Sequence, residues 1–315
     1  MGAPSDFGLA NAWQRDFPLV ARPFAEIAAH AGLSEEDVIR QYTSLKKEGV
    51  IDRIGPVFRP NTVGASCLAA MEVSQARLEE VAALVSGYRG VNHNYERDHR
   101  YNLWFVVTGQ LEAEVQWTLS CIEYAAGLPV LRLPLLEEYH IDLGFDLRTG
   151  AAPRGRTQGA RPSLSADEKR LVARLAGGLP LVAQPYAALG FPQAQVIETL
   201  GRWLDAGIVR RIGAVVRHRS LGYHANAMLV WDVPDERVAQ AGARLAADPA
   251  VTLCYRRARA LPQWPYNLYC MVHGREHGRV LYEAKRISLS LGLAGFDRAI
   301  LFSKRCFTQR AARYG

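Results

Sequence analysis

Hydrophobic and polar positions run through the same succession of patterns twice along the chain. Apolar residues recur at helical spacing over 38–45 and again over 196–204, as expected for the buried face of an amphipathic helix. Each stretch leads into a glycine turn and a short strand, at 49–55 and at 207–213,. Together with the helical segment that precedes each stretch, these repeats predict two helix-turn-helix units, each followed by a β-wing.

Behind each unit the pattern changes to strand, helix, strand, strand, helix, strand. In the first half these elements are expected at 67–73, 75–86, 90–97, 101–108, 111–126 and 130–142. In the second half they are expected at 225–233, 235–247, 251–257, 266–273, 276–291 and 296–303. This βαββαβ order is that of the ferredoxin-like split βαβ unit.

We therefore predict an α+β protein, a tandem duplication of a winged helix-turn-helix followed by a ferredoxin-like βαββαβ domain. The predicted parts are helix-turn-helix 1, ferredoxin-like domain 1, a linker, helix-turn-helix 2 and ferredoxin-like domain 2, at 1–64, 65–148, 149–162, 163–222 and 223–315. The linker is assigned from its Gly, Pro and Thr content. After it, Ser165 with Glu168 three residues later predicts a capping box,.

Composition narrows the class of protein. The 315 residues are 49% apolar and 22% charged, which allows a sizeable core and argues against disorder. No apolar run approaches the ~20 residues that span a bilayer, so no membrane partner is expected. The N-terminus does not resemble a secretory signal, and the five cysteines have no metal-type spacing, so we expect a cytoplasmic protein with reduced thiols. The net charge of +7, mostly from arginine, fits nucleic acid or a multi-carboxylate small molecule, although a GC-rich genome gives the same bias.

The candidate site is the hairpin at 93–105, with the sequence His-Asn-Tyr-Glu-Arg-Asp-His-Arg-Tyr-Asn-Leu-Trp-Phe. If 91–100 is a strand, side chains alternate between its two faces. One face then carries His93, Tyr95, Arg97 and His99. A face toward the core is expected to be apolar, whereas this one carries titratable and cationic groups. We therefore expect it to form the site.

A partial copy of this hairpin returns in the second half. Tyr255 and Arg257 occupy the positions of Tyr95 and Arg97, whereas Leu253 stands where the first half has His93. Because leucine cannot transfer a proton, we expect the chemistry mainly on the first hairpin, with the second hairpin completing the pocket.

The two hairpin motifs resemble those of the siroheme decarboxylases. The motif at 93–105 is similar to that of their first subunit, and those at 254–257 and 264–274, Cys-Tyr-Arg-Arg and Trp-Pro-Tyr-Asn-Leu-Tyr-Cys-Met-Val-His-Gly, are similar to that of the partner subunit. The resemblance covers about 10–310 and indicates a fusion of the two. The domain order also resembles the Lrp/AsnC family, but generic Lrp regulators lack the Tyr-x-Arg and Tyr-Asn-Leu signatures.

This resemblance implies conversion of siroheme to 12,18-didecarboxysiroheme, on the route to haem d1 or, by the alternative pathway, to haem. Protonation of a ring carbon, loss of CO2 and protonation of the methylene require an acid with a pKa near neutrality, but no added cofactor, metal or oxidant. We assign His93 and His99 as the proton donor and as the partner of a carboxylate or of the substrate iron, in an order that stays open.

Substrate-binding residues are expected on both hairpins, because arginine forks suit the eight carboxylates of siroheme and tyrosines can hydrogen-bond them or stack on the ring. The predicted set is Tyr95, Arg97, Tyr101, Asn102, Tyr255, Arg257, Trp264, Tyr266 and Asn267. The repeated Tyr-Asn-Leu segments fit strand packing as well. The histidines outside the hairpins that are expected at the surface are His30, His140, His218, His224 and His277.

Two other functions remain open from the sequence: a DNA-binding transcriptional regulator of the Lrp/AsnC type that responds to a small ligand, and a haem carrier without catalysis. The helix at 34–47 opens with three acidic residues, and its counterpart is expected to be short, at 193–200. Such helices are poor readers of the major groove, so DNA is not an expected partner. Siroheme or a related tetrapyrrole is the expected ligand. Paired ferredoxin-like domains favour a homo-oligomer, and a need for homologous decarboxylase subunits stays open.

Overall fold

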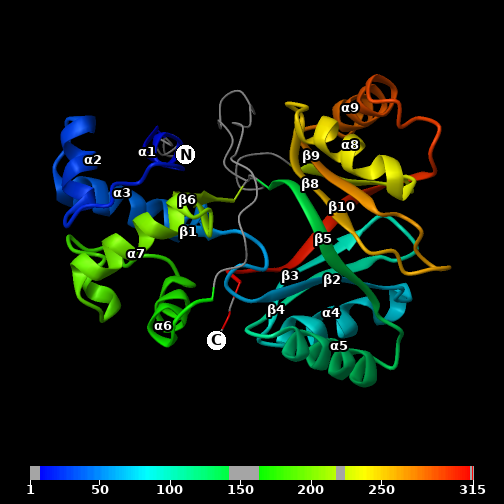
Figure 1. The fold of residues 1–315 in the computed structure, drawn as a ribbon, viewed down its shortest axis with the longest axis horizontal. Coiled ribbons are helices and arrows are strands. Elements are labelled where there is room, and N and C mark those ends of the chain that lie inside the picture. Colours follow the sequence, from blue (N-terminus) through cyan, green and yellow to red (C-terminus); the bar gives the residue numbers. More distant parts are fainter. Residues whose placement is uncertain (1–7, 142–162, 218–223, 313, 315) are drawn as a thin grey trace.

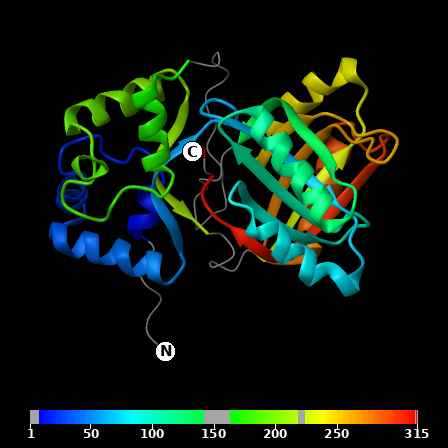
Figure 2. The same cartoon turned by 90° about the horizontal axis from the view of Figure 1, so that it is seen from below.

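The structure is a computed structural model that describes residues 8–141, 163–217, 224–312 and 314. The predicted linker and the boundary at 222 lie outside these ranges. Figures 1 and 2 show a group of helices from both halves on one side and a β-barrel on the other. Within the described parts of the chain, no helix is both long and apolar enough to cross a membrane.

The first group holds both helix-turn-helix units. Its helices are α1 (Gly8–Ala12), α2 (Pro23–Ala31), α3 (Glu35–Lys47), α6 (Ala166–Leu175), η2 (Ala187–Leu189) and α7 (Gln193–Asp205). The Ser165–Glu168 capping box at the start of α6 is present as predicted. The expectation of a short second recognition helix is wrong, because α3 and α7 have 13 residues each. Helix α7 continues to Asp205 because Trp203 adds a buried anchor to its apolar face.

The strand of each helix-turn-helix unit pairs with the strand of the other unit. β1 (Ile51–Phe58) and β6 (Val209–Val216) run antiparallel, with Gly55 opposite Gly213. The two predicted wings therefore meet in a single ribbon, and the buried apolar residues of both units form one continuous core.

The remaining strands close into one eight-stranded barrel. The first half supplies β2 (Ala65–Met71), η1 (Gln75–Arg77), α4 (Leu78–Gly87), β3 (Val91–Arg97), β4 (Leu103–Gly109), α5 (Glu112–Ala126) and β5 (Leu131–Ile141). The second half supplies β7 (Ala225–Trp231), α8 (Asp235–Ala246), β8 (Val251–Arg257), β9 (Leu268–Gly274), α9 (His277–Ser290) and β10 (Arg298–Gln309). Both halves thus follow the predicted order of strands and helices.

Closure of the barrel joins the two halves at two seams. Each half contributes four neighbouring strands, and the seams are the antiparallel pairs β5–β8 and β10–β3. The helices pack on the outer faces of the strands in two separate cores. A third core fills the interior of the barrel with residues from both halves, including Trp104, Met228, Tyr255, Trp264 and Leu301. The two hairpins therefore face the same interior.

One carboxylate ties the barrel to the helix-turn-helix group. Glu138 of β5 lies between Arg59, with 3.7 Å from its Oε2 to the arginine Nε, and Arg210, with which it forms a second ion pair. All three side chains are largely shielded from solvent. Removal of one partner would leave uncompensated charge in this interface, so the ion pairs help to fix how the two parts sit against each other.

Gly213 and Gly201 offer a matched test of this packing. A Cβ at Gly213 would collide with the backbone of Trp13 and Gln14, whereas one at Gly201 in α7 would meet nothing within 4 Å. We expect Gly213→Ala to lower the free energy of unfolding by about 2 kcal/mol and Gly201→Ala to raise it by about 1 kcal/mol. Denaturant titration measures both, and equal effects would contradict the close approach at Gly213.

Candidate functional site

Four residues were predicted to share one face of this strand, and three of them, His93, Tyr95 and Arg97, lie together on β3. We call these three residues the stripe. The rings of His93 and Tyr95 are stacked, with centroids 6.0 Å apart, and the Arg97 guanidinium carbon lies 6.0 Å from the Tyr95 ring centre. Arg97 Nη1 donates to the carbonyl oxygen of Leu301 at 3.1 Å, and Leu301 belongs to the interior core. The three side chains therefore share one face, as strand alternation predicts, and that face points into the barrel, which the sequence did not predict.

His99 does not belong to this stripe, so the expectation that it shares a face with His93 is wrong. β3 ends at Arg97, and His99 lies in the turn beyond, where strand alternation no longer sets its direction. Its Nδ1 accepts the backbone N–H of Tyr101 at 3.0 Å, and its ring meets the edge of Trp264 at 5.4 Å. The two histidines lie toward opposite ends of β3, on the order of 20 Å apart along an extended chain.

His93 lies at the end of β3 that approaches the helix-turn-helix group. Burial lowers its pKa from 6.5 to about 4, with the charge of Asp52 opposing this shift and that of Arg53 adding to it,. Both charged residues belong to β1. The Tyr95 hydroxyl lies 3.5 Å from His93 Nδ1 and donates to Gln309 Oε1 at 3.2 Å. The free protein therefore holds a neutral imidazole at pH 7, next to a phenol and close to β1.

The second hairpin repeats the tyrosine and the arginine. Arg257 lies over the Tyr255 ring with its guanidinium carbon 4.6 Å from the centre, and its Nη1 donates to the Leu133 carbonyl at 2.8 Å. Leu133 on β5 corresponds to Leu301 on β10, because they pair with the equivalent strands β2 and β7. Each arginine thus reaches across to the backbone of the other half and braces the barrel from inside.

An aromatic cluster lies around His99. Trp264 is buried and packs against Tyr101, Trp104 and Tyr266 at ring distances of 6.0, 5.1 and 4.9 Å. Its indole N–H donates to the Tyr269 hydroxyl at 2.7 Å. Trp264 belongs to the interior core, so the loop of the second hairpin closes this end of the barrel with a packed side chain.

The amides of Asn102 and Asn267 are occupied by the backbone. Asn102 accepts the Val73 N–H at 3.0 Å and donates to the Val73 carbonyl at 2.8 Å. Asn267 makes the same pair of bonds to Val233, at 3.0 and 2.8 Å. Both asparagines hold the segment that follows the first barrel strand of their half, β2 or β7, which favours the packing interpretation of the Tyr-Asn-Leu repeats.

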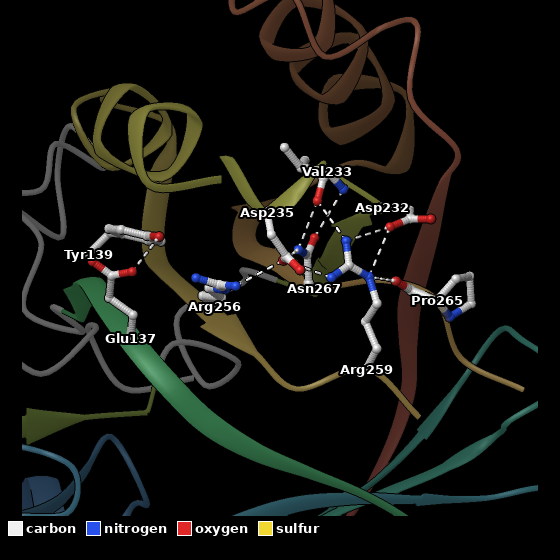
Figure 3. A network of polar contacts seen from close by, with 9 residues as sticks. All are labelled: Glu137, Tyr139, Asp232, Val233, Asp235, Arg256, Arg259, Pro265 and Asn267. Carbon is white, nitrogen blue, oxygen red and sulfur yellow. Dashed lines mark hydrogen bonds and ion pairs between the residues drawn. The ribbon is translucent and has the colours of Figure 1, made fainter. Parts of the chain in front are cut away.

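Figure 3 shows how the loop of the second hairpin is fixed around Asn267. Arg259 donates to Asp232 and Asp235, each at 2.8 Å for the shortest contact, and to the carbonyl oxygens of Val233 and Pro265 at 2.7 and 2.8 Å. This network holds the loop, and therefore Trp264, in place.

A cavity that the sequence did not predict lies where the helix-turn-helix group meets the first half of the barrel. Its volume is about 520 Å³, within the range of small-molecule sites,. It is lined by Lys46, Asp52, Arg53, Arg89, Ala173, Ala176, Gly177, Arg310, Ala311 and Tyr314. No sequence signal could have found it, because these residues come from four separate segments.

One further histidine differs from its prediction. His140 was expected at the surface, but it is buried on β5, where burial and, to a smaller extent, the charge of Arg15 lower its pKa. Its position in a strand at the seam between the halves explains the burial. The five cysteines are all free thiols, as expected.

Comparisons with known proteins identify relatives over the whole chain. Residues 63–140 and 220–308 match the family model of the AsnC-like ligand binding domain, and residues 8–51 and 168–210 match that of the siroheme decarboxylase NirDL-like HTH domain. The siroheme decarboxylase NirDL subunit of Paracoccus denitrificans is 43% identical over 98% of this chain and 96% of its own length. The siroheme decarboxylase NirL subunit of Stutzerimonas stutzeri is 47% identical over 44% of this chain and 83% of its own length. A crystal structure of the siroheme decarboxylase NirDL in co-complex with an iron-uroporphyrin III analogue has a TM-score of 0.69 at 28% identity, covering 96% of this chain and 91% of that one.

The hydrogen bonds from Asn102 and Asn267 to the backbone predict a loss of stability when either side chain is removed. Asn102→Ala and Asn267→Ala each leave a backbone N–H and a carbonyl without their partners, so we expect each to lower the free energy of unfolding by about 2–3 kcal/mol. Denaturant titration at neutral pH measures this. A loss below about 1 kcal/mol combined with impaired ligand binding would contradict the structural role.

The lowered pKa of His93 predicts how the free energy of unfolding depends on pH. Because the folded-state pKa of about 4 lies below the ordinary 6.5, the unfolded chain binds a proton between these values that the folded chain does not. Stability is therefore complete above pH 6.5 and falls as the pH drops toward 4, by at most about 3 kcal/mol from this residue.

We expect His93→Gln to flatten the fall in stability between pH 6.5 and 4, measured as the midpoint of urea unfolding. A residual slope should persist from His99 and His140, whose pKa values are also lowered by burial. An unchanged slope in His93→Gln would show that His93 is not buried in its neutral form.

Proposed function

This chain belongs to the NirDL family of siroheme decarboxylases, and on that premise we propose that it converts siroheme to 12,18-didecarboxysiroheme. The reaction removes CO2 from two acetate side chains, on the route to haem d1 or to haem. The similarity over the full chain to a NirDL subunit favours this activity over a DNA-binding regulator. The observation that carries the site assignment is the half-buried, stacked His93–Tyr95 pair at the end of the barrel, within the electrostatic reach of Arg53.

We further propose that each half is a winged helix-turn-helix followed by a ferredoxin-like domain, with the boundaries predicted above. The strand order within each half, β5-β2-β4-β3 and β10-β7-β9-β8, supports this assignment. The pairing of β1 with β6 supports a structural role for the wings. The match of a separate NirL subunit to 44% of the chain supports a fusion of two ancestral subunits.

The chemistry that we propose is a pair of proton transfers around each loss of CO2. A proton is added to the ring carbon next to the one that bears the acetate, and the bonding pair of the departing carboxylate then forms an exocyclic methylene at the acetate-bearing carbon, which neutralises the cationic ring. The methylene carbon takes a proton while the ring carbon returns one. The net change is one proton consumed and one CO2 released, without electron transfer, so no added cofactor is required and the iron stays part of the substrate.

We assign the proton transfers to His93. With a pKa of about 4 the free imidazole is neutral at pH 7, so it is a weak source of protons until the substrate arrives. The carboxylates of siroheme would favour the imidazolium and raise this pKa toward neutrality, where an acid that must both give and take a proton works best. In this proposal, binding of the substrate therefore favours protonation of the His93 imidazole, which then acts as the acid.

The other hairpin residues take supporting roles in this proposal. Tyr95 holds the imidazole and can donate to a carboxylate, while Arg97 and Arg257 supply positive charge from inside the barrel. Tyr255 forms the matching wall in the second half, where Leu253 cannot protonate. His99 is less suited to acid catalysis, because its Nδ1 accepts a backbone N–H, a bond that protonation of this nitrogen would break. With Tyr101, Trp264 and Tyr266 it closes the far end of the barrel.

Two histidine variants test the assignment. We expect His93→Gln to lower kcat/KM for anaerobic siroheme decarboxylation at least about 100-fold, because the proton donor is lost. His99→Gln is the matched control from the same hairpin, and its loss is expected to stay below about tenfold. Turnover is followed by mass analysis of the extracted tetrapyrrole.

Proton uptake on binding separates the roles further. Titration calorimetry at pH 6 uses iron-uroporphyrin in place of siroheme, so that proton uptake on binding is measured apart from the protons consumed by decarboxylation. In two buffers of different ionisation enthalpy, the wild type should take up at most one proton that His93→Gln does not. Equal turnover of His93→Gln and wild type, with both folded, would overturn the role of His93. Loss of activity only in His99→Gln would move the chemistry to the aromatic end.

A further inference from the structure

The cavity between the helix-turn-helix group and the barrel has a cationic wall built from several parts of the chain. Lys46 comes from the end of α3, Arg53 from β1, Arg89 from the turn before β3, and Arg310 from the end of β10. The single acid in the wall, Asp52, is held by Arg53 and Arg217, each at 2.8 Å. The wall therefore presents an excess of positive charge, which favours an anionic ligand.

This cavity and His93 are close neighbours. Asp52 and Arg53 line the cavity, and both act on the charge state of His93. Arg310 follows Gln309, the residue that pairs with His93 across the β10–β3 seam, and its backbone N–H donates to the Asn92 carbonyl at 2.8 Å. A ligand bound in the cavity would thus lie next to the proposed proton donor.

The polar groups of the wall differ in how firmly they are held. The Arg310 guanidinium donates to the carbonyl oxygens of Val91, Ser86 and Tyr88 at 2.7, 3.0 and 2.7 Å, which fixes its position. Lys46 is exposed on the last turn of α3 and can move toward a ligand. Burial raises the pKa of Tyr314 to about 12, so its hydroxyl stays protonated and can donate a hydrogen bond.

Two cations of the wall, Lys46 and Arg89, are not repeated in the second half. α3 and α7 align without a gap, which places Leu204 at the position of Lys46. Val91 and Val251 make the same turn bond, to Tyr88 and Asp248, which places Pro249 at the position of Arg89. The second half therefore lacks these two cations as well as the histidine, and all three are present in the same half of the molecule.

We propose that this cavity binds the peripheral carboxylates of a polycarboxylate tetrapyrrole, so that the helix-turn-helix group forms part of the substrate site. The inference rests on the proposed function for the identity of the ligand. Carboxylates suit the wall because lysine and arginine can each contribute charge-assisted hydrogen bonds, and the volume of about 520 Å³ accommodates one edge of a macrocycle with its side chains.

Lys46 and Lys47 offer a matched pair for the test. Both lie in the last turn of α3, but only Lys46 lines the cavity, so a change to glutamate alters net charge and the helix end equally in the two variants. The probe is iron-uroporphyrin, an octacarboxylate, and its affinity is read from the shift of the Soret band. We expect Lys46→Glu to weaken binding about tenfold and Lys47→Glu less than about twofold.

Iron-coproporphyrin, which has four carboxylates, is the second probe. Its affinity should change less than that of iron-uroporphyrin in Lys46→Glu, because fewer carboxylates reach the wall. Equal weakening of iron-uroporphyrin binding by the two lysine variants would overturn the proposal, because the loss of affinity would then follow from net charge alone. Duplex DNA that competes with iron-uroporphyrin and loses affinity selectively in Lys46→Glu would also overturn it.

The outcomes distinguish this inference from the proposed function. A wild-type chain that binds iron-uroporphyrin through Lys46 but leaves siroheme intact would keep the carboxylate site and overturn the decarboxylase assignment. Full siroheme turnover with identical kcat/KM in Lys46→Glu and wild type would keep the enzyme and overturn the site.

Discussion

Closure of the barrel through the β5–β8 and β10–β3 seams is the constraint on which the rest of the structure depends. Each half alone would leave two edge strands with unpaired backbone groups, and the other half covers both. The seams turn the hairpins of the two halves toward one interior, where Arg97 and Arg257 each bind the backbone of the opposite half. The common interior that these two arginines face follows from this closure.

Duplication gave the molecule two similar frameworks, and the differences between them locate the chemistry. The tyrosine and arginine of the stripe and the asparagine clamp occur in both halves, which fits their role in holding the barrel. The histidine, Lys46 and Arg89 are found in one half, where Leu253, Leu204 and Pro249 replace them in the other. We therefore interpret the second half as a scaffold that completes one site.

The sequence predicts much of this arrangement where local periodicity decides it. Strand alternation was sufficient for His93, Tyr95 and Arg97, but it stops at the end of β3, so His99 was misplaced. The pairing of β1 with β6 could not be predicted, because the alternation of polar and apolar residues along a strand does not specify which other strand it pairs with. The cavity was also out of reach, since Lys46, Arg89 and Arg310 are brought together only by the docking of the helix-turn-helix group.

The most direct test of the account is anaerobic incubation of the purified chain with siroheme, followed by mass analysis of the extracted tetrapyrrole. The account predicts loss of two CO2 units without an added cofactor or a second protein. Recovery of intact siroheme, despite a spectral change on mixing that shows binding, would contradict the central claim that one histidine-bearing half on a duplicated scaffold is a complete decarboxylase.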